Sequence, residues 1–276
     1  MRVHLNCYSS DPPPWQLDLI VGEFAFDGLR RDYHGLLPLG RQLYQHRSRG
    51  LEMNLLLNPA DPARVVAQAW DVASECAPLG VWPEAVEIGN EWDIGGRVSP
   101  ARARELWTMA HDAIKEKCPA IITVSGGIAS LSPDSLDWLR AVGPIPTDVV
   151  GFHPYRTTSR PDDPRFLGLH DAQPGRTFWQ TECGWHTAPF DRDFPLCWFK
   201  KRWTEEQVAD FLVEDMRQHE AAGVEVYTVY QITDGPGEKP FGIFAEDGRN
   251  KLAAYVARRF KPLYGTAVSL GLGDEP

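Results

Sequence analysis

The sequence predicts an α/β fold, a (β/α)8 TIM barrel that occupies residues 1–276 as a single domain. Runs rich in β-forming residues recur eight times at an average spacing of about 32 residues, the length of one strand–helix–strand step. Helical patterns lie between these runs, and such alternation yields either a closed barrel or an open doubly wound sheet. No glycine-rich phosphate turn follows an early run, so we favour the barrel.

Each expected strand is a short apolar run bounded by polar or turn-forming residues. In chain order, the runs cover residues 2–8, 26–30, 51–57, 85–88, 121–125, 149–152, 177–181 and 224–231. These steps use the whole chain, and no proline-, glycine- or serine-rich linker divides it.

Capping residues followed by apolar residues at helical spacing predict the helices. Such helices begin at Asp61, Ser99, Thr204 and Asn250. Gln207 completes a capping box with Thr204. Four tryptophans lie in helical patterns and are expected to pack against the core: Trp15, Trp70, Trp107 and Trp138.

The charge balance and the hydropathy exclude two classes of partner. The chain has 28 Lys and Arg against 38 Asp and Glu, a formal charge of −10, whereas a nucleic-acid-binding chain shows a clustered basic face. Its longest apolar runs are far shorter than the roughly 20 residues that cross a bilayer. We therefore expect no nucleic-acid and no membrane partner, and the oligomeric state stays open.

The cysteines and the N-terminus bear on the cellular compartment. There are 5 cysteines, without a CxxC spacing, which argues against a closed disulfide framework. The first residues lack the sustained apolar stretch of a signal peptide. We expect a cytoplasmic protein, or a secreted one if a leader has been removed.

Two glutamates follow strands at the end of the barrel where function is expected. Glu91 comes after the run 85–88, and Glu182 after the run 177–181. Active sites of such barrels lie at the carboxyl ends of the strands, so both carboxylates can reach one cavity. Paired carboxylates are the groups that glycoside hydrolysis needs. Trp92 and Trp185 follow the same two strands, and Tyr155 follows the run 149–152. All three offer flat apolar faces for sugar rings.

The residues at three strand ends carry a family resemblance. Asn90-Glu91 after the fourth strand, His153-Pro154-Tyr155 after the sixth and Glu182 ending the seventh resemble the retaining β-glycosidases of glycoside hydrolase clan A. The pattern covers nearly the whole chain. The resemblance implies that Glu91 is the general acid/base and that Glu182 is the nucleophile.

The resemblance also implies roles in substrate binding. Asn90 would hydrogen-bond the sugar 2-hydroxyl, and Arg30 would lie against the nucleophile. His153 and Tyr155 would contact the nucleophile or the sugar. Many clan members end the eighth strand with a tryptophan under the sugar, and Tyr230 is the candidate for that place here.

These roles are also coherent physically. A guanidinium at Arg30 would keep Glu182 ionised and nucleophilic. Burial and a neighbouring negative charge would raise the pKa of Glu91, as a general acid requires.

Other polar residues receive simpler interpretations. Asp27, Asp93 and Glu87 are expected to be loop or solvated carboxylates, and Cys183 a packing thiol. No HxH, HExxH or His/Cys cluster is present, so no metal and no cofactor is expected. The long segments 186–203 and 233–250 are expected to form the walls that select the substrate.

The sequence thus predicts a retaining hydrolase that cleaves β-glycosidic bonds in an oligo- or polysaccharide by double displacement. Three alternatives remain open. The same site could catalyse transglycosylation, the barrel could bind carbohydrate without catalysis, or it could be a metal-dependent hydrolase.

Overall fold

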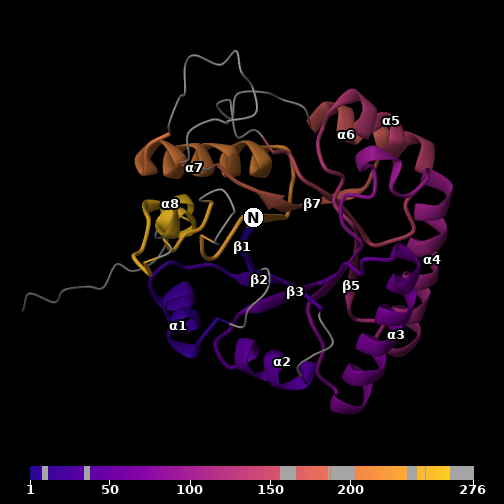
Figure 1. Ribbon diagram of the computed structural model, residues 1–276, viewed down its shortest axis with the longest axis horizontal. Coiled ribbons are helices and arrows are strands. Elements are labelled where there is room, and N and C mark those ends of the chain that lie inside the picture. The colour runs from indigo at the N-terminus through magenta and orange to yellow at the C-terminus, as the bar shows by residue number, and fades with distance from the viewer. Residues whose placement is uncertain are drawn as a thin grey trace, which may run out of the picture.

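The computed structural model describes residues 1–7, 12–33, 38–155, 166–185, 187, 203–234, 241–245 and 247–261. They form a closed barrel of parallel strands surrounded by helices, in which β8 pairs with β1 (Figure 1). The strands are β1 (Arg2–Cys7), β2 (Gly28–Asp32), β3 (Glu52–Leu57), β4 (Ala85–Ile88), β5 (Ile122–Ser125), β6 (Val149–Phe152), β7 (Thr177–Cys183) and β8 (Val226–Val229). The predicted (β/α)8 fold class is confirmed.

The helices alternate with the strands along the chain. They are α1 (Pro14–Gly22), α2 (Leu39–Arg47), α3 (Val65–Cys76), α4 (Pro100–Lys117), α5 (Pro133–Val142), α6 (Phe166–Ala172), α7 (Glu205–Ala221) and α8 (Val256–Phe260). The described residues also include 3-10 turns η1 (Pro62–Arg64), η2 (Ala77–Leu79), η3 (Ile94–Gly96) and η4 (Leu252–Tyr255). No helix among the described residues is both long and apolar enough to cross a membrane.

Two of the four predicted helix starts, Ser99 and Thr204, cap α-helices. Asp61 caps the 3-10 turn η1, which leads into α3. The prediction for Asn250 is wrong, because Lys251 precedes η4 and α8 begins only at Val256. The Ser99 side chain accepts a hydrogen bond from the backbone N–H of Arg102 at the start of α4, and Thr204 forms the predicted capping box with Gln207 at the start of α7. The second strand, in contrast, lies two residues later than predicted. Phe26 still donates its N–H to the Ile20 carbonyl in α1, so the regular strand begins only at Gly28.

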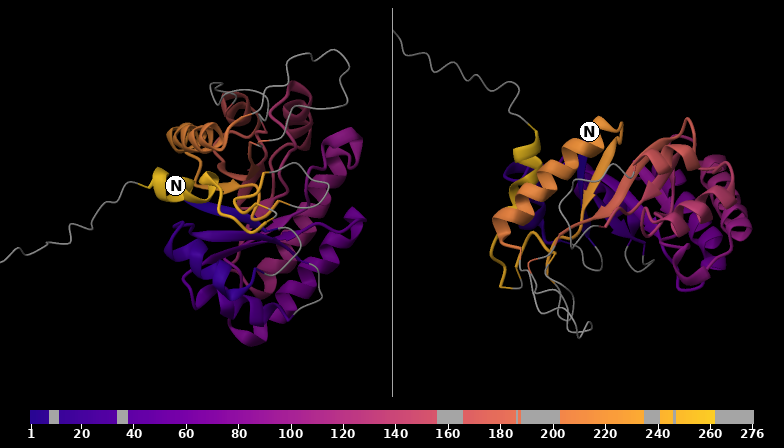
Figure 2. Two further views of the ribbon diagram at one scale, coloured as in Figure 1. Left: turned by 60° about the vertical axis from the view of Figure 1, so that its left-hand side comes forward. Right: turned by 90° about the horizontal axis from the view of Figure 1, so that it is seen from above.

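The strands separate three apolar clusters. One lies between the barrel and helices α2 to α6, and a second lies between the barrel and helices α1, α7 and α8. Figure 2 shows α7 and α8 side by side on the outside of the barrel. The third cluster lies inside the barrel and consists of Ala85, Val124, Val149, Trp179 and Val226. We call it the apolar plug.

The helical tryptophans only partly follow the prediction. Trp107 is buried, and its indole N–H donates to the Ile88 carbonyl at 2.7 Å. Trp138 is partly buried against the apolar cluster between the barrel and helices α2 to α6, to which Trp107 also belongs. For Trp15 and Trp70 the prediction of core packing is wrong: Trp15 is 54% exposed at the edge of Phe244, and Trp70 is an exposed surface residue.

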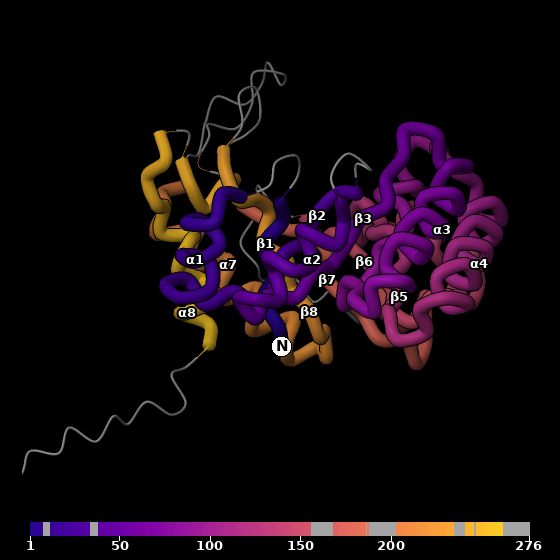
Figure 3. The backbone as a smooth tube through the Cα atoms, turned by 90° about the horizontal axis from the view of Figure 1, so that it is seen from below, coloured from indigo at the N-terminus to yellow at the C-terminus, as the bar shows by residue number. Residues whose placement is uncertain are grey.

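All strands run parallel, so their carboxyl ends meet at one end of the barrel. Figure 3 shows the barrel from the side, with the N-terminus at its lower end and the carboxyl ends of the strands at the opposite end. The described cysteines Cys7, Cys76, Cys118 and Cys183 are buried free thiols, and Cys197 lies outside the described residues.

Candidate active site

A buried ion pair forms the floor of the site. Arg30, on β2, donates from Nε to Glu87 Oε2 at 2.6 Å and from Nη2 to Glu87 Oε1 at 3.0 Å. Both side chains are 0% exposed. The interpretation of Glu87 as a loop or solvated carboxylate is therefore wrong. Val86 and Ile88 pack outward against the helices, so the strand alternation directs Glu87 into the barrel.

Arg30 links this floor to Glu182 and Asn90. Its Nη1 donates to Glu182 Oε2 at 2.9 Å, and its Nη2 donates to Asn90 Oδ1 at 3.0 Å. One guanidinium thus joins β2, β4 and β7. Since Arg30 engages the amide oxygen of Asn90, the amide nitrogen of Asn90 is its remaining hydrogen-bonding group.

Glu182 lies at the end of β7 and is only 6% exposed. Its second oxygen, Oε1, accepts a hydrogen bond from the Tyr155 hydroxyl at 2.5 Å. Burial raises the pKa of Tyr155 well above its usual value, and the neighbouring Glu182 charge and hydrogen bond raise it further. Tyr155 therefore stays a neutral donor, and Glu182 is fixed from both sides as an acceptor.

Glu91 projects from a turn after β4 that needs an unusual backbone. Its φ is 51°, in the left-handed region that few residues other than glycine adopt. Its backbone N–H donates to the Gly127 carbonyl at 2.9 Å, which holds the turn against the chain that follows β5. Such strained positions occur where the surrounding structure fixes them, and they are common at functional sites.

His153 lies between Glu91 and the wall of β7. Its Nδ1 is 2.9 Å from Glu91 Oε1, and its Nε2 is 3.1 Å from the Thr181 hydroxyl. A methyl group on Gly127 would meet the His153 ring at 2.2 Å, so only glycine permits this ring position. These contacts orient His153 toward Glu91.

The pKa of Glu91 shifts in the direction opposite to our expectation. Burial raises it, but the hydrogen bond and charge of His153, with the charges of Arg30 and Arg97, lower it by more. The net effect is a pKa below the usual value. We expected a raised pKa because the sequence did not reveal that His153 contacts Glu91.

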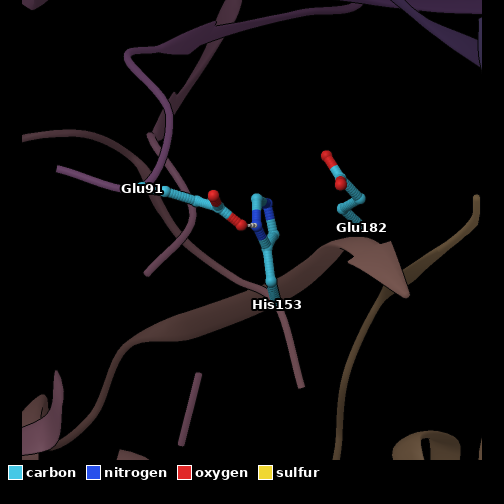
Figure 4. A group of neighbouring side chains, drawn as sticks. All are labelled: Glu91, His153 and Glu182. Atoms are coloured by element: carbon cyan, nitrogen blue, oxygen red, sulfur yellow. Dashed lines mark hydrogen bonds and ion pairs between the residues drawn. The ribbon is translucent and has the colours of Figure 1, made fainter. Parts of the chain in front are cut away.

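The two glutamates approach closely enough to act on one atom. A carboxylate oxygen of Glu91, a ring nitrogen of His153 and a carboxylate oxygen of Glu182 all lie within 4.8 Å of one another. Figure 4 shows Glu91 and Glu182 on opposite sides of His153. Retaining glycosidases place their carboxyl groups about 5 to 5.5 Å apart and inverting ones about 6.5 to 9.5 Å. The two side chains can therefore reach a common reacting atom.

The same three groups are the candidate metal ligands among the described residues. Their ligand atoms serve other partners, because His153 uses both ring nitrogens and Glu182 both oxygens in hydrogen bonds. The Arg30 guanidinium beside Glu182 would also repel a cation. The arrangement suits a hydrogen-bonded carboxylate pair better than a metal centre.

Tyr155, which donates to Glu182, belongs to a group of three aromatic rings. Tyr155 packs edge-on against Tyr230 and Phe241, with ring centroids 6.2 and 6.1 Å away, and Tyr230 and Phe241 are 5.4 Å apart. Tyr230 comes directly after β8 and Phe241 from the segment that follows. We call Tyr155, Tyr230 and Phe241 the aromatic wall.

Two predicted sugar-stacking residues lie elsewhere. Trp92 is 5% exposed and stacks on Trp107 at 5.6 Å, flat against Gly89, where a methyl group would meet the indole at 2.4 Å. Trp185 is 1% exposed and packs beside Phe211. The structure places both in the core, which corrects our assignment of these rings to the sugar site.

Some residues around the site were not predicted. Glu87 could have been found, because it alternates with outward-facing apolar residues on an identified strand. Thr181, Gly127 and Phe241 carry no local signal, since their roles depend on contacts with distant strands. Of the two segments expected to form walls, most of 186–203, and residues 235–240 and 246 of the other, lie outside the described residues.

Neither a protein-family model nor a curated protein sequence matches this chain. Solved structures do match it. The exo-β-1,4-mannosidase Op5Man5 from Opitutaceae bacterium strain TAV5 has a TM-score of 0.68 and 16% identity, over 94% of this chain and 59% of the mannosidase. Our chain thus spans less than two thirds of that protein.

Two further neighbours are similar over most of both chains. A GH5_18 protein from Streptomyces cattleya, solved in complex with Manβ1-4GlcNAc, has a TM-score of 0.68 and 18% identity over 96% of this chain and 82% of that one. A GH128 exo-β-1,3-glucanase from Aureobasidium namibiae has a TM-score of 0.66 and 16% identity over 95% and 98%. At these identities the likeness shows the fold, which is the barrel that the resemblance to clan A predicted.

Proposed function

We propose that this chain is a retaining glycoside hydrolase that cleaves β-glycosidic bonds in an oligo- or polysaccharide. One observation carries the proposal. Glu182 is held as an acceptor between Arg30 at 2.9 Å and Tyr155 at 2.5 Å, with an oxygen of Glu91 within 4.8 Å. The glycoside hydrolases among the structural neighbours support the same class of reaction.

In the first half-reaction, Glu182 acts as the nucleophile. One of its oxygens bonds to the anomeric carbon, and the bond from that carbon to the glycosidic oxygen breaks with its electron pair going to the oxygen. The departing oxygen takes a proton from Glu91. Arg30 and Tyr155 orient the attacking carboxylate, which reduces the entropic cost of reaching the carbon.

His153 fixes the position of the group that gives this proton. Its Nδ1 lies 2.9 Å from Glu91 Oε1. In the free protein the hydrogen bond and charge of His153 lower the pKa of Glu91, against the raising effect of burial. His153 therefore sets both the orientation and the acidity of Glu91.

In the second half-reaction, Glu91 acts as a base. It accepts a proton from a water molecule whose oxygen attacks the anomeric carbon, and the bond to Glu182 breaks with its electron pair returning to the carboxylate. No metal or cofactor enters either step of this proposal.

The surrounding groups would bind the sugar. Asn90, whose oxygen is held by Arg30, would donate its amide N–H to the 2-hydroxyl group. The aromatic wall would contact the C–H faces of the ring. These are the roles that the resemblance assigns to Asn90, Tyr155 and Tyr230, and Phe241 adds to them.

The experiment is covalent trapping. The protein is incubated with activated 2-deoxy-2-fluoro-β-glycosides of several sugars, and the intact mass and the modified peptide are measured. We expect an adduct on Glu182, and Glu182→Gln should give none. Glu52→Gln, which changes a carboxylate paired with Arg2 outside the site, is the matched control and should still react.

The outcomes separate the alternatives. An adduct on another carboxylate would refute the assignment of Glu182. Saturable glycan binding without an adduct or hydrolysis for any sugar would favour a barrel that binds without catalysis. Excess transfer product in the presence of an acceptor sugar would favour a transglycosylase, and loss of activity on chelation would favour a metal-dependent hydrolase.

A further inference from the structure

A group of buried polar side chains inside the barrel has atoms without a protein partner. Among the described residues, no hydrogen-bond partner is found for His4 Nδ1, Asn6 Oδ1 and Nδ2, Asn54 Oδ1 and Thr228 Oγ1. All four side chains are buried. Both polar atoms of Asn6 belong to this set, so its whole amide is without a partner in the protein.

Strand alternation places these side chains in the barrel interior. On β1, Val3, Leu5 and Cys7 pack outward against the helices, so His4 and Asn6 face inward. By the same alternation Thr228 faces inward, between Tyr227 and Val229, which pack outward.

The residues are also neighbours along the barrel wall. Thr228 is paired in register with His4. Asn6 is paired in register with Arg30, which is paired in turn with Asn54. The unpartnered atoms therefore follow one continuous arc of the wall from β8 through β1 and β2 to β3.

This arc lies between two known layers. The apolar plug occupies the same interior nearer the amino ends of the strands. Arg30, which stands in register between Asn6 and Asn54, belongs to the ion pair with Glu87 and contacts Glu182. The arc is thus next to the floor of the candidate active site.

Leaving these atoms unpaired would be costly. A buried polar group without a hydrogen bond costs about 1 to 3 kcal/mol, and native proteins contain few such groups. The set contains both donors and acceptors, since an amide carries both and a hydroxyl can act as either. A ligand that satisfies them must be small and must donate and accept.

The charges nearby exclude ions as that ligand. The Arg30 guanidinium beside Asn6 and Asn54 would repel a cation, and the Glu87 carboxylate bonded to Arg30 would repel an anion. Water donates and accepts, and buried water typically makes about three hydrogen bonds to groups of this kind.

We propose that the barrel interior beside Arg30 binds a cluster of ordered water molecules held by Asn6, Asn54 and Thr228. The cluster lies next to the buried ion pair of Arg30 and Glu87. This inference concerns the interior alone and does not depend on the proposed hydrolysis.

The first test is a high-resolution crystal structure of the full chain. We expect ordered water within hydrogen-bonding distance of the Asn6 amide, with Thr228 Oγ1 or Asn54 Oδ1 as a second partner. Direct pairing of these side chains with one another around a dry interior would overturn the proposal.

The second test is Thr228→Val, which replaces the hydroxyl with a methyl group of the same shape. If water binds Thr228, the variant loses a hydrogen bond and its Tm falls. If the interior is dry, removing an unpaired hydroxyl raises the Tm, which would refute the proposal.

Thr147→Val is the matched control. The Thr147 hydroxyl is also buried but donates directly to the Val149 carbonyl at 2.8 Å, so its loss lowers the Tm whatever fills the interior. Water-oxygen magnetic relaxation dispersion gives an independent readout: Thr228→Val should reduce the number of long-lived buried waters, and Thr147→Val should not. An unchanged number in Thr228→Val would also refute the proposal.

Discussion

Replacing Arg30 with methionine tests whether the floor of the site is one charged network. Arg30 donates hydrogen bonds to Glu87, Glu182 and Asn90 from a fully buried position. In Arg30→Met, Glu87 stays buried with only two long contacts, from Gly127 N at 3.3 Å and Asn54 Nδ2 at 3.4 Å. An uncompensated buried charge of this kind costs about 3 to 5 kcal/mol.

The expected loss is large enough to measure by equilibrium unfolding in urea. For a domain of this size it corresponds to a fall in Tm of roughly 6 to 20 °C. The double variant Arg30→Met/Glu87→Leu removes the stranded carboxylate, so it should recover most of the lost free energy of unfolding. Its activity should stay low, because Glu182 still lacks its guanidinium partner.

Arg249→Met is the control. Arg249 pairs with Glu205 at 2.8 Å in an exposed position, and breaking such a surface pair changes the free energy of unfolding little. The reasoning fails if Arg30→Met is no more damaging than Arg249→Met. It also fails if the double variant is less stable than Arg30→Met alone, because Glu87 would then be stable without its partner.

Three further predictions concern the site. His153→Phe removes the contact that lowers the pKa of Glu91, so this pKa should rise. Glu91 then stays protonated to higher pH, and the alkaline limb of the kcat/KM profile should move to higher pH. An alkaline limb at the same pH as in the wild type would contradict this. Tyr155→Phe removes a hydrogen bond to the carboxyl group of Glu182 worth about 1.5 to 3 kcal/mol, so kcat/KM on an aryl glycoside should fall roughly 10- to 150-fold. Tyr33→Phe, which removes a hydroxyl bonded to Glu75 on the surface, should leave kcat/KM unchanged, and equal losses would refute a specific role for Tyr155. Gly127→Ala forces a methyl group against His153, so hydrolysis should fall sharply, and wild-type kcat would show that the ring position is unimportant.

The sequence by itself determined the fold and the locations of the two glutamates. Strand periodicity and capping residues are local signals, so the order of elements and the starts of α4 and α7 follow from short segments. In any parallel barrel the strand ends share one face, so residues that directly follow strands must gather there. For that reason the sequence alone places Glu91 and Glu182 at the same end of the barrel.

The tertiary structure decided which groups contact those glutamates. Closure of the barrel joins Arg30 on β2 to Glu87 on β4 and Glu182 on β7. No local sequence pattern encodes which residues of these separate strands meet inside the barrel. The left-handed backbone at Glu91 redirects the chain, and Trp92, the next residue, lies in the core instead of the rim. Contacts between distant strands also bring His153 to Glu91, which reverses the expected direction of its pKa shift. Side-chain orientation and electrostatics depend on these through-space neighbours, whereas secondary structure depends mainly on neighbours along the chain.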